Sequence, residues 1–172
     1  MNKNLWRCGL GLGLALAAWA VHADTLTAVV TYVTDGDTLW VQLPGESRAV
    51  KLRFQGIDAP ELCQDGGAAS KAALAAKVLH RTVQLSTNQR RDDYGRLLAR
   101  VSVGTGAKAQ DVGAWMVQQG QAWSYRYRRS LGPYASQEQA AQAAKRGLWA
   151  MPAPIEPRVF RKRHGSCHTP AP

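Results

Sequence analysis

The sequence predicts an α+β fold in which a small five-stranded Greek-key barrel of the OB type carries about three helices. Five short segments rich in Val, Leu and Thr are separated by polar or tight turns, which is typical of strands. A segment with helical spacing interrupts them after the third strand, and two more follow the fifth. This order of elements matches an OB-type barrel.

The first three strands are expected at residues 26–33, 38–43 and 48–55. Thr and Val dominate the first of them. Asp35-Gly36 provides a turn before the second strand, and Pro44-Gly45-Glu46-Ser47 provides a hairpin-type connection to the third. Three short strands joined by tight turns predict a meander.

The first helix is expected at residues 67–81. Its apolar residues recur at the spacing of one helix face: Ala72, Ala75, Ala76 and Leu79. Residues 83–87 and 97–103 are the expected fourth and fifth strands. The polar segment 89–95 between them is expected to be an exposed loop.

The second helix is expected at residues 111–119, with Gly120 placed to end it. Its expected buried residues are Val112, Trp115 and Met116. The third helix is expected at residues 133–146, with Pro133 in its first turn. Its repeated alanines favour close packing against the barrel.

The first 23 residues resemble a secretory signal peptide. Lys3 and Arg7 form a positively charged start, residues 8–21 are an uncharged apolar run, and Ala23 follows with the small side chain that a signal peptidase prefers. The run is shorter than the ~20 residues that a membrane-spanning helix needs. We expect cleavage after Ala23, with a retained membrane anchor as the alternative.

The mature chain is then expected to hold one catalytic or binding domain over residues 24–151 and a Pro-rich basic tail over residues 152–172. We expect it to be exported to the periplasm or the cell exterior, free of the membrane, and monomeric.

The chain is strongly basic, with 22 Lys and Arg against 12 Asp and Glu and a formal charge of +10. Removal of Lys3 and Arg7 would lower this charge to +8. A basic surface attracts polyanions such as nucleic acids. Seven of the twelve acidic residues lie close to the motifs described next, and an acidic pocket on a basic body favours an enzyme over a plain binding module.

Three motifs supply carboxylates, arginines and a tyrosine: Asp35-Gly36-Asp37-Thr38, Arg53-Phe54-Gln55-Gly56-Ile57-Asp58-Ala59-Pro60-Glu61 and Tyr94-Gly95-Arg96. Phosphodiester hydrolysis builds negative charge on phosphoryl oxygens, and positioned arginines stabilise that charge. Ca²⁺ and Mg²⁺ take oxygen ligands such as carboxylates. Each motif alone has an ordinary explanation as a turn or a surface cation. Together, in this order, they indicate phosphate chemistry.

These motifs resemble those of the staphylococcal nuclease (thermonuclease) family over about residues 29–149. The resemblance implies a Ca²⁺ site formed by two aspartates and a backbone carbonyl: Asp37, Asp58 and Ala59. It implies two arginines at the scissile phosphate and a glutamate that positions or deprotonates water: Arg53, Arg96 and Glu61. Asp35 resembles an acidic residue of the family that lies next to the metal ligands without binding the metal itself.

Three tyrosines are candidate substrate-binding residues. Tyr125 and Tyr127 follow Gly120 much as the family places its base-stacking tyrosines, although the spacing differs by one residue. Tyr94 is the third, with coverage of the barrel end as its alternative role. Asp93 stands where the family archetype has a lysine at the terminal phosphate, so recognition of a strand end is expected to differ.

Cys63 and Cys167 remain in the expected mature chain. An even cysteine count in an exported protein favours a disulfide, with free thiols or intermolecular pairing as the alternative. This bond would tie the loop after Glu61 to the C-terminal tail. The tail cluster Arg161-Lys162-Arg163 is interpreted as a solvated or phosphate-tracking patch, outside the catalytic centre.

The sequence therefore predicts a Ca²⁺-dependent nuclease that cleaves phosphodiesters in DNA and RNA with little sequence preference. The resemblance implies 3′-phosphate products. One alternative is a catalytically silent OB-type module that only binds nucleic acid. Another is an enzyme that acts on a different phosphate ester, such as a nucleotide or a phospholipid headgroup.

Overall fold

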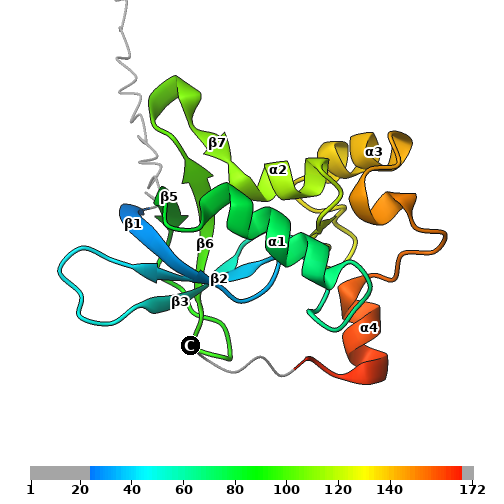
Figure 1. The fold of residues 1–172 in the computed structure, drawn as a ribbon, viewed down its shortest axis with the longest axis horizontal. Coiled ribbons are helices and arrows are strands. Elements are labelled where there is room, and N and C mark those ends of the chain that lie inside the picture. Colours follow the sequence, from blue (N-terminus) through cyan, green and yellow to red (C-terminus); the bar gives the residue numbers. More distant parts are fainter. Residues whose placement is uncertain (1–23, 168–172) are drawn as a thin grey trace, which may run out of the picture.

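The computed structural model describes residues 24–167, and Figure 1 shows a small barrel with helices packed around one end and one side. The predicted signal peptide at residues 1–23 and the end of the predicted tail at residues 168–172 lie outside the described residues. Five strands form the barrel: β1 (Asp24–Val33), β2 (Thr38–Gln42), β3 (Val50–Phe54), β5 (Thr82–Thr87) and β6 (Leu97–Val103). The five predicted strands are therefore confirmed, with ends that differ by a few residues.

The barrel closes because β3 pairs with two neighbours. β1 pairs antiparallel with β2 and β5, β2 with β3, and β5 with β6. A parallel pairing of β3 with β6 then joins the two ends of the sheet, with Leu52 opposite Leu97 and Phe54 opposite Ala99. Alternating residues of these strands fill the interior, where Leu39, Leu52 and Leu85 are fully buried.

Three very short strands were not predicted. β7 (Gln110–Asp111) extends the sheet beside β6, and β4 (Ile57–Asp58) pairs with β8 (Trp123–Ser124) in a separate two-stranded sheet. Two residues are too few to show the alternation by which a strand is recognised. β4 matters for the site because it fixes the backbone of Asp58 against Trp123.

Four α-helices are present in the described residues, where the sequence predicted about three. They are α1 (Gly67–Val78), α2 (Val112–Gln118), α3 (Ala135–Ala143) and α4 (Pro157–His164), and short 3₁₀ turns occupy Gly106–Lys108 and Gly147–Ala150. The fourth helix lies inside the predicted tail. Pro157 opens it at a position where proline is favoured, and basic residues fill its last turn, where they complement the helix dipole.

The predicted face of α1 was only partly right, because Ala75 and Leu79 are partly buried against the core but the other two predicted residues are not. Ala72 and Ala76 are exposed, whereas Ser70, Leu74 and Val78 are buried. Alanines occur around most of this helix, so their spacing does not select one face, and the larger apolar surfaces of Leu74 and Val78 decide the packing. For α2 the prediction was closer, because Val112 and Met116 are buried and Trp115 is partly buried.

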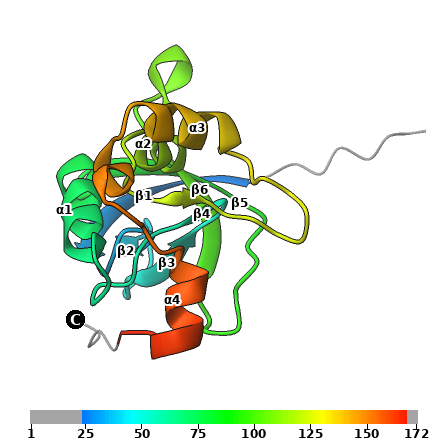
Figure 2. The same cartoon turned by 90° about the vertical axis from the view of Figure 1, so that its right-hand side faces the viewer.

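Three of the helices contact one another in sequence, α1 with α2 and α2 with α3, and the fourth stands apart. Figures 1 and 2 show α2 and α3 beside each other over one end of the barrel, while α4 lies apart from them, beyond β3 and β4. Within residues 24–167, no helix has the length and apolar character that crossing a bilayer requires.

Candidate active site

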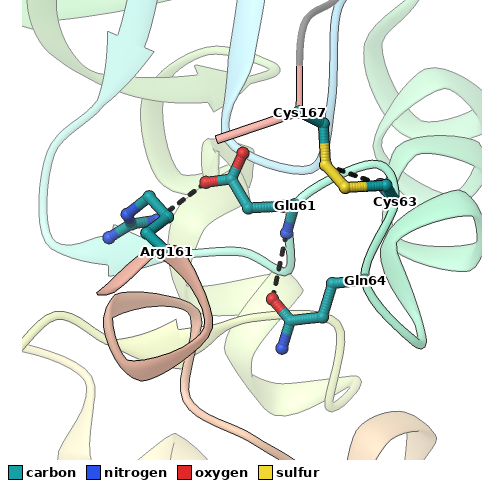
Figure 3. The surroundings of a disulfide bond; sticks show 5 residues. All are labelled: Glu61, Cys63, Gln64, Arg161 and Cys167. Atoms are coloured by element: carbon teal, nitrogen blue, oxygen red, sulfur yellow. Dashed lines mark hydrogen bonds and ion pairs between the residues drawn. A yellow bond between two sulfur atoms is a disulfide. The ribbon is translucent and has the colours of Figure 1, made fainter. Parts of the chain in front are cut away.

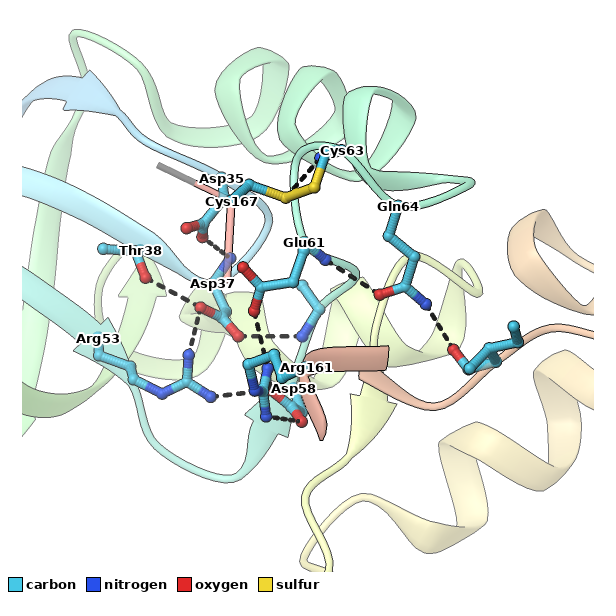
Figure 4. A network of polar contacts seen from close by, with 12 residues as sticks. Asp35, Asp37, Thr38, Arg53, Asp58, Glu61, Cys63, Gln64, Arg161 and Cys167 are labelled. Atoms are coloured by element: carbon cyan, nitrogen blue, oxygen red, sulfur yellow. Dashed lines mark hydrogen bonds and ion pairs between the residues drawn. A yellow bond between two sulfur atoms is a disulfide. The ribbon is translucent and has the colours of Figure 1, made fainter. Parts of the chain in front are cut away.

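β3 aims Arg53 into the site. Its neighbours Leu52 and Phe54 point into the barrel core, so the alternation of the strand turns Arg53 outward. Its Nη1 donates to Asp37 Oδ1 at 2.6 Å, and its Nη2 donates to Asp58 Oδ1 at 2.9 Å (Figure 4). Burial acts to lower the pKa of the guanidinium, but the charges of the two aspartates outweigh it and raise that pKa. Arg53 therefore links the two candidate metal ligands as a permanent cation.

The turn before β2 places Asp37 under Arg53. Asp37 is buried, and its Oδ1 also accepts a hydrogen bond from Thr38 Oγ1 at 2.9 Å. Its Oδ2 accepts from the backbone N–H of Ala59 at 3.0 Å. Asp35 Oδ1 accepts from the backbone N–H of Asp37 at 3.0 Å. Burial, followed by the nearby charge of Asp37, raises the pKa of Asp35 to about 7.

The β4 strand and the bend after it carry Asp58 and Glu61. Asp58 is buried, and Glu61 is partly exposed at the next turn of the chain. The Glu61 backbone N–H donates to Gln64 Oε1 at 3.2 Å, which steadies the bend. A Cβ atom on Gly67 would lie only 1.9 Å from the Glu61 carbonyl oxygen, so the start of α1 can approach this bend only as glycine.

Arg161 of α4 completes the cluster, which the sequence did not predict. Its Nη1 donates to Asp58 Oδ1 at 3.1 Å and to Glu61 Oε1 at 3.0 Å, and its Nη2 donates to Asp58 Oδ2 at 2.8 Å (Figure 4). Burial acts to lower the pKa of Arg161, but its bonds to Asp58 and Glu61 raise it. The interpretation of Arg161 as part of a solvated patch was therefore wrong. Lys162 and Arg163 are exposed, as that interpretation expected.

A disulfide holds α4 beside the site. Cys63 and Cys167 are bonded, as the sequence favoured, and the backbone N–H of Cys63 also donates to Cys167 Sγ at 2.9 Å (Figure 3). On the other side of α4, Gln64 Nε2 donates to the carbonyl of Ile155 at 2.6 Å. The predicted disulfide was the signal that could have located Arg161. It holds Cys167, six residues after Arg161, beside Cys63, two residues after Glu61.

The loop before β6 presents Arg96 on the opposite side of the site. Its Nε donates to Asp92 Oδ2 at 2.7 Å, while Asp92 Oδ1 accepts from the backbone N–H groups of Tyr94 and Arg96. Partial burial acts to raise the pKa of Asp92, but the hydrogen bonds from Arg96 outweigh it and lower the pKa. The Arg96 guanidinium lies 5.2 Å from the ring centre of Tyr94, which is 83% exposed. Segment 89–95 is the largely exposed loop that was predicted.

A cavity of about 790 Å³ joins the two sides. Its walls include residues from both: Asp37, Arg53, Glu61, Arg96, Arg161 and Tyr125. Tyr94 and Asp35 also line it, whereas Tyr127, which is 61% exposed, does not. The structure therefore brings the predicted catalytic, metal-binding and substrate-binding residues together around one cavity, except Tyr127 and Asp58. The Asp58 side chain is only 4% exposed and lies beneath Arg53 and Arg161.

The donor chemistry of the site fits a hard cation, but the carboxylates bond to arginines. Asp37, Asp58 and the neighbouring Ala59 backbone offer oxygen ligands of the type that Ca²⁺ takes. Within residues 24–167, however, no three His, Cys, Asp or Glu side chains converge in a way that would hold a metal ion. Both oxygens of Asp58 accept hydrogen bonds from arginine instead.

Comparison with known proteins gives the family. The family model described as staphylococcal nuclease homologue matches residues 51–151. The chain belongs to this family. An uncharacterized endonuclease of Escherichia coli is 34% identical over 152 residues, which cover 88% of this chain and 95% of its own length. An uncharacterized endonuclease of Haemophilus influenzae is 36% identical over 84% of this chain and 78% of its own length.

A micrococcal nuclease of Shigella flexneri is 31% identical over 156 residues, which cover 87% of this chain and 86% of its own length. The family and these relatives identify the chain as a hydrolase of the nuclease class. The site residues that lie within the matched family segment include Arg53, Asp58, Glu61 and Arg96. Asp37 precedes this segment, and Arg161 follows it.

Proposed function

We propose that the chain is an exported, Ca²⁺-dependent nuclease that hydrolyses phosphodiester bonds of DNA and RNA with little sequence preference. The observation that carries the proposal is the cavity in which Arg53, Arg96 and Glu61 face a common space beside Asp37 and Asp58. This arrangement supplies fixed positive charge, a carboxylate for water and oxygen ligands for a cation within one site.

Asp37, Asp58 and the carbonyl of Ala59 are the residues that would hold Ca²⁺. When bound, the cation supplies Lewis acidity and neutralises charge on the phosphate. Arg53 holds the two carboxylates side by side, so that they share one small region although they come from different strands. Asp35 supports Asp37 through its backbone N–H.

Arg53 and Arg96 stabilise the developing negative charge of the phosphoryl oxygens. Arginine suits this role because its planar fork donates two parallel hydrogen bonds to phosphate and stays charged. Asp92 orients the Arg96 guanidinium through its Nε, which leaves that guanidinium lining the cavity. Arg53 approaches from β3 and Arg96 from the loop before β6, so the phosphate would lie between them.

Glu61 positions the attacking water or accepts its proton. Its side chain lines the cavity, and its Oε1 is fixed by Arg161. Tyr125 and Tyr94 border the same cavity, which supports a role in stacking on the bases of the bound strand. Such stacking tolerates any sequence. We propose 3′-phosphate products, monomeric action and export through cleavage after Ala23. The Cys63–Cys167 disulfide supports export, because disulfides persist in oxidising compartments.

The test is digestion of circular single-stranded DNA by the purified protein in Ca²⁺, in Mg²⁺ and in excess EGTA. Cleavage that requires Ca²⁺ and is lost in Asp58→Asn would support the proposal. A folded protein that binds the DNA but cleaves neither circular nor linear strands in any of these ions would instead identify a binding module. Matched DNA and RNA substrates test the lack of preference. Products that a polymerase extends only after phosphatase treatment would carry the proposed 3′-phosphate.

A further inference from the structure

We propose that Arg161 sets the divalent-cation affinity of this site by occupying Asp58 until a cation displaces it. The inference rests on the proposed cation dependence of the site. Its starting observation is that the Asp58 carboxylate is bound on both oxygens by one guanidinium, with Nη1 at 3.1 Å and Nη2 at 2.8 Å. This two-pronged contact is the strongest form of arginine–carboxylate pairing.

Arg161 and a cation compete for the same atoms. Asp58 Oδ1 already accepts from Arg53, so Oδ2 is the oxygen whose polar partner is Arg161 alone among the described residues. A cation that takes Asp58 Oδ2 as a ligand would meet the Arg161 guanidinium, which lies 2.8 Å from that oxygen, and two positive charges at such short range repel each other. Cation binding therefore requires Arg161 to leave at least Oδ2.

The position of Arg161 makes it the arginine that can leave. It lines the cavity, whereas Asp58 lies beneath it, and its side chain is 28% exposed against 17% for Arg53. Arg53 is fixed by a strand of the barrel that pairs on both sides. Arg161 stands on the eight-residue helix α4, which lies apart from the other helices at the edge of the molecule (Figure 2). A short movement of α4 or a change of rotamer frees Asp58 without disturbing the barrel.

The anchors on both sides of α4 keep Arg161 close after it leaves. The Cys63–Cys167 disulfide holds the chain after the helix, and the bond from Gln64 to Ile155 holds the chain before it (Figures 3 and 4). Because Arg161 is part of the same chain, it competes for Asp58 at a high effective concentration. Arg161 therefore acts as an internal competitor that is always present, and its release is coupled to cation binding.

This coupling is reciprocal. If binding of a cation weakens the Arg161–Asp58 contact, that contact must weaken the binding of the cation by the same factor. Coupling of this kind typically changes the affinity for one ligand by roughly 5–150-fold. We expect removal of the Arg161 charge to tighten Ca²⁺ binding by about tenfold, at the lower end of this range because the guanidinium is partly solvated.

The experiment is isothermal titration of Ca²⁺ into the purified, disulfide-bonded protein in the absence of substrate, comparing wild type with Arg161→Gln. Arg158→Gln is the matched control, because it removes the same charge from an exposed position on the same helix. Arg161→Lys keeps the charge but cannot bind both oxygens of Asp58 at once. The Ca²⁺ affinity of this variant is therefore expected to lie between that of wild type and that of Arg161→Gln. Circular dichroism checks the fold of each variant, and Arg161→Lys carries the test if Arg161→Gln does not fold.

Tighter Ca²⁺ binding in Arg161→Gln with little change in Arg158→Gln supports the inference. Equal tightening in both variants would reduce the effect to net charge and overturn it, as would unchanged or weaker binding in Arg161→Gln. Failure of the proposed cation dependence looks different, because wild type and all three variants would then show no Ca²⁺ binding at all. That result would overturn both proposals, whereas equal binding by wild type and Arg161→Gln would overturn only this one.

Discussion

Arg53 on β3 and Arg161 on α4 make the same kind of contact with very different support. Each guanidinium bridges two carboxylates of the site, and both share Asp58. Arg53 belongs to a barrel strand inside the family segment, whereas Arg161 follows that segment and reaches the site from a helix tied down by a disulfide. The site therefore combines one arginine that belongs to the barrel with a second arginine that comes from a helix outside the barrel.

The difference lies in how each contact depends on the rest of the molecule. Arg53 is held because Leu52 and Phe54 on either side of it are locked in the core. Arg161 is held by local anchors that involve Cys63, Gln64 and Cys167. Loss of the first arginine should therefore affect stability and chemistry together, and loss of the second should leave the barrel intact.

The largest expected effect is that of Arg53→Gln. Removal of this arginine leaves Asp37 and Asp58 buried beside each other, and breaking a buried ion pair in this way typically costs about 3–5 kcal/mol. Arg161→Gln should cost less, about 1 kcal/mol, because Arg53 still donates to Asp58 Oδ1 and the Arg161 side chain is itself 28% exposed. Urea unfolding in EGTA measures both, with Arg100→Gln as a control on the exposed side of β6. Equal losses for the two site arginines would show that the contact from α4 stabilises the fold as much as the contact from β3.

Arg96→Ala should lower turnover of single-stranded DNA by about 10²–10³-fold, since loss of one group that stabilises the transition-state charge has that typical effect. The fold should remain intact, because the Arg96 side chain bonds mainly to Asp92 of its own loop, and its contact with Thr38 of β2 is long, at 3.5 Å. Steady-state kinetics and a thermal melt separate the two effects. Near-normal turnover in a folded variant would remove Arg96 from the catalytic centre.

The barrel side of the site was predictable from the sequence because it depends on local patterns. Arg53 follows from strand alternation between Leu52 and Phe54, and Asp37 from an Asp-Gly turn at the start of a strand. The order of strands and helices then brings these segments to one end of the barrel. The paired cysteines were predictable from their number and the expected export.

The α4 side was not predictable, because a basic cluster in a Pro-rich tail looks the same whether it is solvated or docked. Whether the cluster is solvated or docked depends on how close the tail lies to the Glu61 bend, and only the folded structure gives that distance. The same limit applies to Asp58, which a two-residue strand positions, and to the buried face of α1. Tyr125 and Tyr127 are two residues apart in sequence, but only Tyr125 borders the cavity.

Replacement of Cys63 and Cys167 by serine should lower the free energy of unfolding by about 2–4 kcal/mol, with the chain-entropy model setting an upper value near 4.7 for a loop of this size. The closed loop spans 104 positions. Hydrogen exchange should show the loss of protection concentrated in α4 and in the bend at Glu61, while β3 stays protected. Uniform loss across the barrel would show that α4 is part of the same cooperative unit as Arg53.

Tyr125 and Tyr127 offer a smaller and more local contrast. Tyr125→Ala should raise the KM for single-stranded DNA by about 5–160-fold, which corresponds to the ~1–3 kcal/mol that stacking of one base contributes. Tyr127→Ala should change it much less, because that ring lies outside the cavity and packs 5.3 Å from the guanidinium of Arg128. Equal effects of the two substitutions would mean that the strand extends beyond the cavity along segment 125–128.

The smallest effect concerns the pH dependence of the Asp92–Arg96 pair. The pKa of Asp92 is lower in the folded protein than its ordinary value, so the folded state favours the ionised carboxylate. The resulting stability is present above the ordinary pKa of about 3.9 for aspartate and is lost as the pH falls through the lower value of the folded state. The stability difference between wild type and Asp92→Asn should therefore be constant near neutral pH and shrink in acid. This pair lies on the loop before β6, and within residues 24–167 its hydrogen bonds and ion pairs do not reach α4, so the same profile is expected when the disulfide is removed. A profile that changes with the disulfide would show that the two sides of the cavity are coupled.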